Sequence, residues 1–258
     1  MNLFDSHSHY NDEKFEIDRE QIIKETFSNG VSNFIVAGYN IEGSKKAIEI
    51  AQNHEQVYAT VGISPNDVDD IKASVNENIL SIEEIAKNRK VVAIGEIGLD
   101  YYWNKENKEL QKEVFIKQIE VANKLNLPIV IHTRDAFIDT IEILKQNAVN
   151  KKGVFHCCPL NQELVKEAIK LDYYISLSGV ITFKNAKNVE EIINLIPEDR
   201  LLIETDSPYL APEPVRGTRN NCMNVKYVAE KIAIIKNKTT EEIAELTNEN
   251  AKRIFQMS

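Results

Sequence analysis

Four histidines and two carboxylates interrupt or follow short apolar runs in this chain. An ionisable side chain in a buried parallel strand is costly unless it is paired or bound to a metal. A single buried histidine is commonly a hydrogen-bonded core residue, but that explanation does not account for four at one repeated location. Imidazole nitrogens and carboxylate oxygens together form a donor set suited to divalent ions. These donors are His7, His9, Glu96, His132, His156 and Asp206.

The spacing of the donors predicts that they gather at one end of the strands. Residues two apart in a strand point to the same side, so His7 and His9 share a direction. Glu96 follows Val92 and Ile94 at the same interval, and the other donors follow apolar residues in a similar way. If the apolar residues fill a barrel interior, the donors meet at its mouth, where barrel active sites are built. Four imidazoles and two carboxylates there can hold two metal ions.

Two further carboxylates share this spacing. Asp5 lies two residues before His7, and Glu204 lies two residues before Asp206. A metal-bound histidine commonly donates its second N–H to a carboxylate, so we expect Asp5 and Glu204 to orient the ligands from behind. A turn or cap role is the alternative for Asp5. His54, the fifth histidine, lies in a polar stretch and is expected at the surface.

The elements that must position these residues alternate along the chain. Short apolar, β-branched runs are followed by amphipathic stretches, which is the pattern of parallel β/α units. Helical periodicity is clearest over residues 108–125. Ser81 with Glu84, and Thr239 with Glu242, predict capping boxes. We expect eight strands, near residues 3–7, 33–38, 57–62, 91–96, 129–132, 154–156, 173–177 and 201–205.

These elements predict one α/β domain over residues 1–258, a single (β/α)8 TIM barrel with an additional C-terminal helix. No linker, composition break or low-complexity tract divides the chain. A doubly wound open sheet is the structural alternative, because periodicity alone does not prove that the sheet closes. A hydrophobic content of 43% with 28% charged residues excludes wholesale disorder.

The charge balance constrains how a polyanionic substrate could be held. The 31 basic and 40 acidic residues give a formal charge of -9, so any attraction for phosphate must be local. We expect a cytoplasmic protein with no membrane association, because the sequence shows neither a signal-peptide pattern nor a membrane-spanning apolar run. The three cysteines, of which Cys157 and Cys158 are adjacent, are expected to be free thiols.

With these residues assembled, the sequence resembles the TatD family of metal-dependent hydrolases, TIM-barrel deoxyribonucleases that use Mg2+ or another divalent ion. The resemblance spans essentially the whole chain, and the ordered series of motifs is far more specific than one His-x-His. The motifs are Asp5-Ser6-His7-Ser8-His9, Gly95-Glu96-Ile97-Gly98-Leu99-Asp100-Tyr101-Tyr102, Ile131-His132-Thr133-Arg134, Phe155-His156-Cys157, Thr182-Phe183-Lys184-Asn185-Ala186, and Glu204-Thr205-Asp206-Ser207-Pro208-Tyr209-Leu210-Ala211-Pro212 with Arg216-Gly217.

The resemblance implies a deoxyribonuclease that hydrolyses DNA phosphodiester bonds exonucleolytically, by a two-metal mechanism with an activated water. Its expected partner is DNA, single-stranded or at a 3′ end, and a monomer is favoured. Asp206 is implied as the group that accepts a proton from the water, with Glu96 as its catalytic companion. The family pattern implies two divalent ions (Mg, Mn or Zn), held as follows: His7, His9 and Asp206 on one ion, His132 and His156 on the other, and Glu96 bridging.

Basic and aromatic residues near the same strand ends are candidates for substrate binding. Arg134 follows a predicted ligand by two residues, and Arg216 and Lys184 lie in predicted rim loops, where they could contact phosphate oxygens. Each could equally be a solvated surface charge. An aromatic cluster runs from Tyr101 to Trp103 and could stack on a nucleotide base or could pack the barrel mouth.

One departure from the family pattern leaves other functions open. Ser64 stands before Pro65 where the family usually has a histidine thought to lie near the substrate phosphate. A small-molecule amidohydrolase or esterase that uses the same metal pair is therefore one alternative, since such a site attacks carbonyl and phosphoryl centres alike. A barrel that binds nucleic acid without catalysis is another. Ser64 remains a candidate substrate-binding residue.

Overall fold

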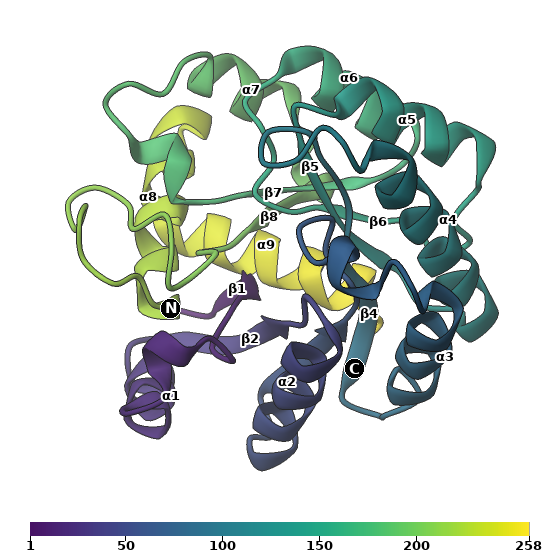
Figure 1. Cartoon of the computed structure of the whole chain (residues 1–258). Helices are drawn as coiled ribbons and strands as arrows, with labels where there is room; N and C mark the ends of the chain where they lie inside the picture. Colours follow the sequence, from purple (N-terminus) through teal and green to yellow (C-terminus); the bar gives the residue numbers. More distant parts are fainter. Residues whose placement is uncertain (258) are drawn as a thin grey trace.

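The computed structural model describes residues 1–257 and shows eight parallel strands arranged in chain order around a barrel (Figure 1). Contacts just beyond the strand ends join the last strand to the first. The N–H of Asp206 donates to the carbonyl of His7 at 3.0 Å, and the N–H of His9 donates to the carbonyl of Ser207 at 2.6 Å. The strands are β1 (Leu3–Ser8), β2 (Val31–Ala37), β3 (Val57–Val61), β4 (Val91–Asp100), β5 (Ile129–Arg134), β6 (Gly153–Phe155), β7 (Tyr174–Leu177) and β8 (Leu201–Ile203).

Helices connect successive strands on the outside of the barrel, and two more follow the last strand (Figure 1). Several begin at a residue whose side-chain oxygen accepts a backbone N–H, as Asn40 does for α2 and Asn161 for α6. The helices are α1 (Arg19–Ser28), α2 (Ile41–Asn53), α3 (Val75–Ile85), α4 (Lys108–Leu125), α5 (Phe137–Gln146), α6 (Gln162–Lys170), α7 (Val189–Leu195), α8 (Val225–Lys236) and α9 (Thr240–Ile254), with short 3-10 helices at Glu13–Phe15, Val68–Ile71, Gly179–Thr182, Glu198–Arg200 and Cys222–Asn224.

The predicted eight strands and additional C-terminal helix are confirmed, and so is the closed arrangement over the open sheet. Helix α4 spans the predicted residues 108–125, and Thr239 and Glu242 form the predicted capping box at the start of α9. The capping box predicted at Ser81 is wrong. Ser81 lies inside α3, and its hydroxyl donates to the carbonyl of Glu77 one turn earlier, as serine can do within a helix.

The interior of the barrel is filled by apolar side chains and is closed at one end by α9. This inner cluster takes one or two residues from most strands and is completed by α9, which crosses the barrel (Figure 1). A filled interior leaves the mouth at the opposite end as the place for polar groups. The cluster comprises Phe4, Ile35, Val92, Ala93, Val130, Val154, Tyr174 and Leu202 from the strands with Ala251, Ile254 and Phe255 from the C-terminal segment.

Strand β4 departs from the regular alternation that the sequence pattern predicts. Val92 belongs to the inner cluster, but Ile94 packs in the layer between the barrel and the helices. Ala93 also belongs to the inner cluster, and the pairing of β4 with β3 shifts between Val91 and Ala93, so the inward and outward sides exchange before Ile94. The pairing of β4 with β5 is irregular again between Ile94 and Ile97. This irregularity, rather than an unbroken two-residue period, accompanies the placement of Glu96 at the barrel mouth.

Gly98 lies where β4 approaches β5 closely. It pairs with His132, its φ is +138°, and an added β-carbon would collide with the carbonyl oxygen of His132.

Among residues 1–257, no helix is long and apolar enough to cross a bilayer.

We predict that Gly98→Ala lowers the free energy of unfolding by roughly 2–5 kcal/mol, from strained backbone and the forced shift of β5. Gly217→Ala is the matched control, because Gly217 also has a positive φ (+84°) but nothing lies within 4 Å of the position of its β-carbon. That control should cost about 1 kcal/mol, from backbone strain alone. Urea unfolding measures both values, and equal losses in the two variants would contradict the role given to the β4–β5 approach.

Candidate metal centre

Four of the predicted donors lie close together at the barrel mouth: His7 at the end of β1, His9 just after it, Glu96 within β4, and Asp206 in the segment after β8. His7 Nε2 lies 3.2 Å from His9 Nε2, and these nitrogens lie 3.6 and 3.7 Å from Glu96 Oε2. Asp206 Oδ1 lies 3.7 Å from the His7 nitrogen and 3.3 Å from the His9 nitrogen. Tetrahedral ligands at 2.0–2.2 Å from an ion are separated by about 3.3–3.6 Å. The atoms of His7, His9 and Glu96 therefore lie close enough to share one divalent ion, and Asp206 lies beside both imidazoles.

A second set of three donors lies at the ends of β4, β5 and β6. His132 Nδ1 lies 2.9 Å from Glu96 Oε1 and 3.1 Å from His156 Nε2, and the latter nitrogen lies 3.3 Å from the same carboxylate oxygen. Both sets use Glu96, one through each oxygen. Three protein donors with a further position open to solvent or substrate are typical of a catalytic metal site. The structure thus brings all six predicted donors together.

The charges at the centre follow from this packing. Burial opposes ionisation of Glu96, but His156, His132 and His7 surround its carboxylate and hold its pKa well below its usual range. Asp206 is also buried, and the neighbouring His9 and His7 hold its pKa below its ordinary value. Two ionised carboxylates that face imidazole nitrogens are what cations require of a binding site.

Asp100 supports the second set and was missed by the sequence reasoning. Its Oδ2 lies 2.9 Å from His132 Nε2, the ring nitrogen that faces away from Glu96. Its Oδ1 accepts the backbone N–H groups of Tyr102 and Trp103 at 2.9 and 3.1 Å. Burial raises the pKa of Asp100, but the His132 hydrogen bond outweighs this and lowers it. The spacing 96, 98, 100 along one strand was the signal that could have identified it.

The two carboxylates expected behind the ligands behave differently. Glu204 Oε1 lies 3.5 Å from His156 Nδ1 and accepts the N–H of Cys157 at 2.6 Å, so it faces a donor as expected. Asp5 instead accepts the backbone N–H of His7 at 3.2 Å and the Thr205 hydroxyl at 2.6 Å. Asp5 therefore joins the backbones of β1 and β8, rather than orienting an imidazole ring.

A cavity of about 770 Å³ opens over the donors, and the structure divides the predicted substrate residues between its lining and other places. Arg134 and Ser64 line it. Tyr101 does not, because its ring is buried and its hydroxyl donates to Asp139 at 2.7 Å. Arg216 is also outside the lining: its guanidinium stacks on Phe183 and donates to the carbonyl of Ala211. Lys184 is exposed and lies outside the lining as well.

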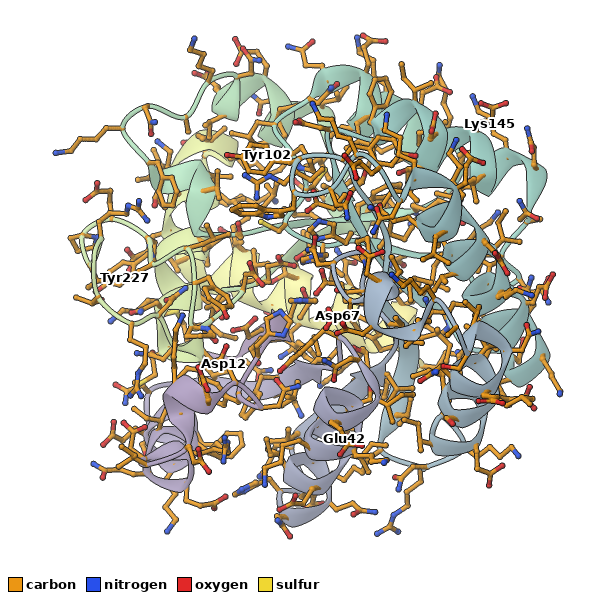
Figure 2. All side chains as sticks on the ribbon, in the orientation of Figure 1. Asp12, Glu42, Asp67, Tyr102, Lys145 and Tyr227 are labelled. Atoms are coloured by element: carbon orange, nitrogen blue, oxygen red, sulfur yellow. The ribbon has the colours of Figure 1, made fainter. Side chains whose placement is uncertain are left out.

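Two carboxyl groups that sequence reasoning missed line another part of this cavity. Asp67 accepts the Ser64 hydroxyl at 2.6 Å, and Asp12 accepts the Tyr209 hydroxyl at 2.7 Å. Figure 2 shows Asp12 and Tyr102 on different sides of the barrel mouth. His54 lies outside the cavity lining, at the end of α2, where its ring is 15% exposed and faces Glu20 at 3.3 Å. The expectation of a surface His54 was therefore only partly right, because most of its ring is covered.

We predict that Asp100→Asn weakens metal binding by about 10- to 100-fold. An amide has one oxygen, so it cannot accept the His132 N–H and also accept the backbone N–H groups of Tyr102 and Trp103. Asp69→Asn is the matched control, since Asp69 accepts hydrogen bonds from Asn104 and Asn107, in the segment that follows Tyr102 and Trp103, but makes no hydrogen bond or ion pair with any of the six predicted metal ligands. Competition of Mn2+ or Zn2+ with a chelating dye measures the affinity. Unchanged affinity in Asp100→Asn would contradict the supporting role.

Comparison with known proteins relates the chain to metal-dependent hydrolases. The family model described as TatD related DNase matches residues 4–256. The chain is 44% identical to the uncharacterized metal-dependent hydrolase YabD of Bacillus subtilis, covering 99% of this chain and 100% of that one. It is 36% identical to the corresponding hydrolase YcfH of Escherichia coli, covering 99% and 96%.

Solved structures give the same picture of the fold. The TatD homologue YJJV of Escherichia coli superposes with a TM-score of 0.91 at 25% identity, covering 99% of this chain and 98% of that one. A TatD-family hydrolase from Entamoeba histolytica superposes with a TM-score of 0.89 at 23% identity, covering 100% and 99%. The TIM barrel with its C-terminal helix is therefore shared along the full length of these chains.

Proposed function

The chain belongs to the TatD family of metal-dependent hydrolases, and from that premise we propose that it is a deoxyribonuclease acting through two divalent ions. The observation that carries the proposal is the sharing of Glu96 between two three-donor groups, one with His7 and His9 and one with His132 and His156, at the floor of one cavity. Divalent ions held there would lower the pKa of a water molecule and offset the charge that develops on a phosphodiester in its transition state.

The side chains at the centre have separate tasks in this reaction. His7, His9 and Asp206 would hold one ion, His132 and His156 the other, and Glu96 both. The Asp206 carboxylate is ionised and lines the cavity, so it can accept the proton released when water attacks phosphorus. Asp100 and Glu204 keep the second-set imidazoles in place from behind.

Local charge explains how an acidic protein could hold DNA. Two dications against Glu96 and Asp206 give the centre a formal charge of +2, within a chain of -9. Arg134 is the one lysine or arginine among the residues that line the cavity in the described chain. Attraction for phosphate would therefore be concentrated at the two metal ions and at Arg134.

The opposite part of the lining supports cleavage from a strand end. Asp12 and Asp67 are carboxylates that accept hydrogen bonds from hydroxyl groups. They therefore offer no hydrogen-bond donors to the phosphates of a strand that continued past them. A single-stranded 3′ end that terminates in the cavity avoids this contact. We place the enzyme in the cytoplasm as a monomer, where its three free cysteines stay reduced.

We predict that His132→Ala and Asp206→Ala each keep the fold but lower the metal-dependent hydrolysis of single-stranded DNA by at least about 100-fold. His54→Ala is the matched control, since it removes a histidine outside the centre, and should retain the wild-type rate and its sensitivity to EDTA. Circular dichroism and timed digestion of a labelled oligonucleotide provide the measurements. Undiminished, EDTA-insensitive cleavage by either donor variant would overturn the assignment.

A second candidate is a small-molecule hydrolase that uses the same donors. It is favoured by the carboxyl groups of Asp12 and Asp67 in the cavity and by Ser64, which hydrogen-bonds to Asp67. We predict that, with Mn2+ or Mg2+ added, oligonucleotides and nitrophenyl phosphodiesters are hydrolysed faster than simple amides and carboxylic esters. The reverse order would favour the second candidate, and binding of DNA without turnover would indicate a non-catalytic barrel.

A further inference from the structure

Two large aromatic side chains and an arginine form an exposed group at the edge of the cavity. Trp103 is 68% exposed and Tyr102 is 51% exposed, although both are aromatic. Their rings meet edge to face with centroids 4.9 Å apart. The Arg134 guanidinium lies 3.8 Å from the centroid of the Tyr102 ring and 5.5 Å from that of Trp103. We call these three residues the Trp103 platform; Trp103 and Arg134 line the cavity over the donors.

The Trp103 platform is held in place through a metal-centre residue. Asp100 Oδ1 accepts the backbone N–H groups of Tyr102 and Trp103, while its Oδ2 contacts His132. Gln111 fixes the Asp100 backbone in turn, by accepting its N–H at 2.8 Å and donating to its carbonyl at 3.0 Å. An exposed aromatic turn held this firmly is pre-organised for a ligand, because little ordering remains to be done on binding.

Arg134, the charged member of the Trp103 platform, has N–H groups that are free to donate hydrogen bonds to a ligand. Within residues 1–257, Arg134 has no carboxylate within 4.0 Å and makes no side-chain hydrogen bond. Arg200 and Arg219, by contrast, pair with Asp172 and Asp18. A guanidinium stacked by one face on an aromatic ring keeps its N–H groups free at the edge, the geometry that binds phosphate oxygens.

We infer that the Trp103 platform is a subsite for an unpaired nucleobase together with its adjoining phosphate. Trp103 offers a π-face to the base, whatever the base is, and Arg134 offers donors to the phosphate. This inference rests on the proposed function and deepens it, because it assigns the residues that would hold a base and a phosphate of the single strand beside the metal centre. It also assigns the side of the cavity on which the strand lies, opposite Asp12 in the view of Figure 2, where Tyr102 is labelled.

The chain carries its own reporter of this contact, because Trp103 is its one tryptophan. We predict that a ten-nucleotide phosphorothioate oligothymidylate, which resists cleavage, quenches tryptophan emission saturably. An abasic phosphorothioate strand of the same length keeps the charges but has no bases, and should leave the emission nearly unchanged. Equal quenching by both strands, or binding of oligothymidylate without quenching, overturns the inference.

Variants separate stacking from general loss of binding. Trp103→Ala should weaken the binding of fluorescein-labelled oligothymidylate by about 5- to 150-fold, measured by anisotropy, while the abasic strand loses much less. Arg134→Ala should weaken both strands. Tyr227→Ala is the matched control, since Tyr227 also has a cation–π contact, with Lys226 on α8, and lies well apart from Tyr102 (Figure 2). An equal loss for both strands in Trp103→Ala contradicts base stacking.

The outcome of these experiments is distinguishable from that of the proposed function. If the wild-type enzyme cleaves DNA but its Trp103 emission is quenched equally by oligothymidylate and by the abasic strand, the subsite inference fails and the deoxyribonuclease proposal stands. If oligothymidylate binds and quenches as expected but no divalent ion supports cleavage, the subsite stands and the deoxyribonuclease proposal fails. If neither strand binds at all, the subsite inference is overturned.

Discussion

The rest of this structure depends on one buried, ionised carboxylate, Glu96, whose two oxygens face two separate groups of imidazoles. A negative charge at this depth is stable only where cations or hydrogen-bond donors surround it, so the donor-bearing positions on or just after β1, β4, β5 and β6 must reach the same level of the barrel. The irregular pairing of β4 beyond Ile94 and the closeness of Gly98 to His132 accompany the placement of Glu96 beside His132. The apolar interior below supplies the rigid base from which these side chains project.

The rim around the centre is divided in its chemistry. Loops after β1 and β3 bring carboxyl groups, Asp12 and Asp67, whose oxygens are already engaged by hydroxyl groups. Loops after β4 and β5 bring an aromatic surface and a guanidinium that no carboxylate neutralises in residues 1–257. Under the proposed function, such a divided rim would favour a single direction of approach for a polyanion. The family fold thus fixes the reaction centre, while the loops determine what reaches it.

The fold and the six donors could be predicted from the sequence because they obey short-range rules. Alternating strands and helices, and polar residues at strand ends, are visible without tertiary information. The failures depended on contacts between distant segments. Tyr101 turns away to Asp139, Arg216 is held by Ala211 and Phe183, and neither contact has a signature in the spacing of residues. Asp100 was hidden because β4 continues beyond the predicted end of the strand.

Helix α9 closes the barrel from the end opposite the donors, and its Asn248 donates to the carbonyl of Asn2 at 2.9 Å, a contact between residues 246 positions apart. Such junctions require the loss of chain entropy before they return any stabilisation, which makes folding slow relative to proteins built from local contacts. The donors of the centre come from β1, β4, β5 and β6 and from the segment after β8. The centre can therefore form only after segments from nearly the whole described chain have been brought together.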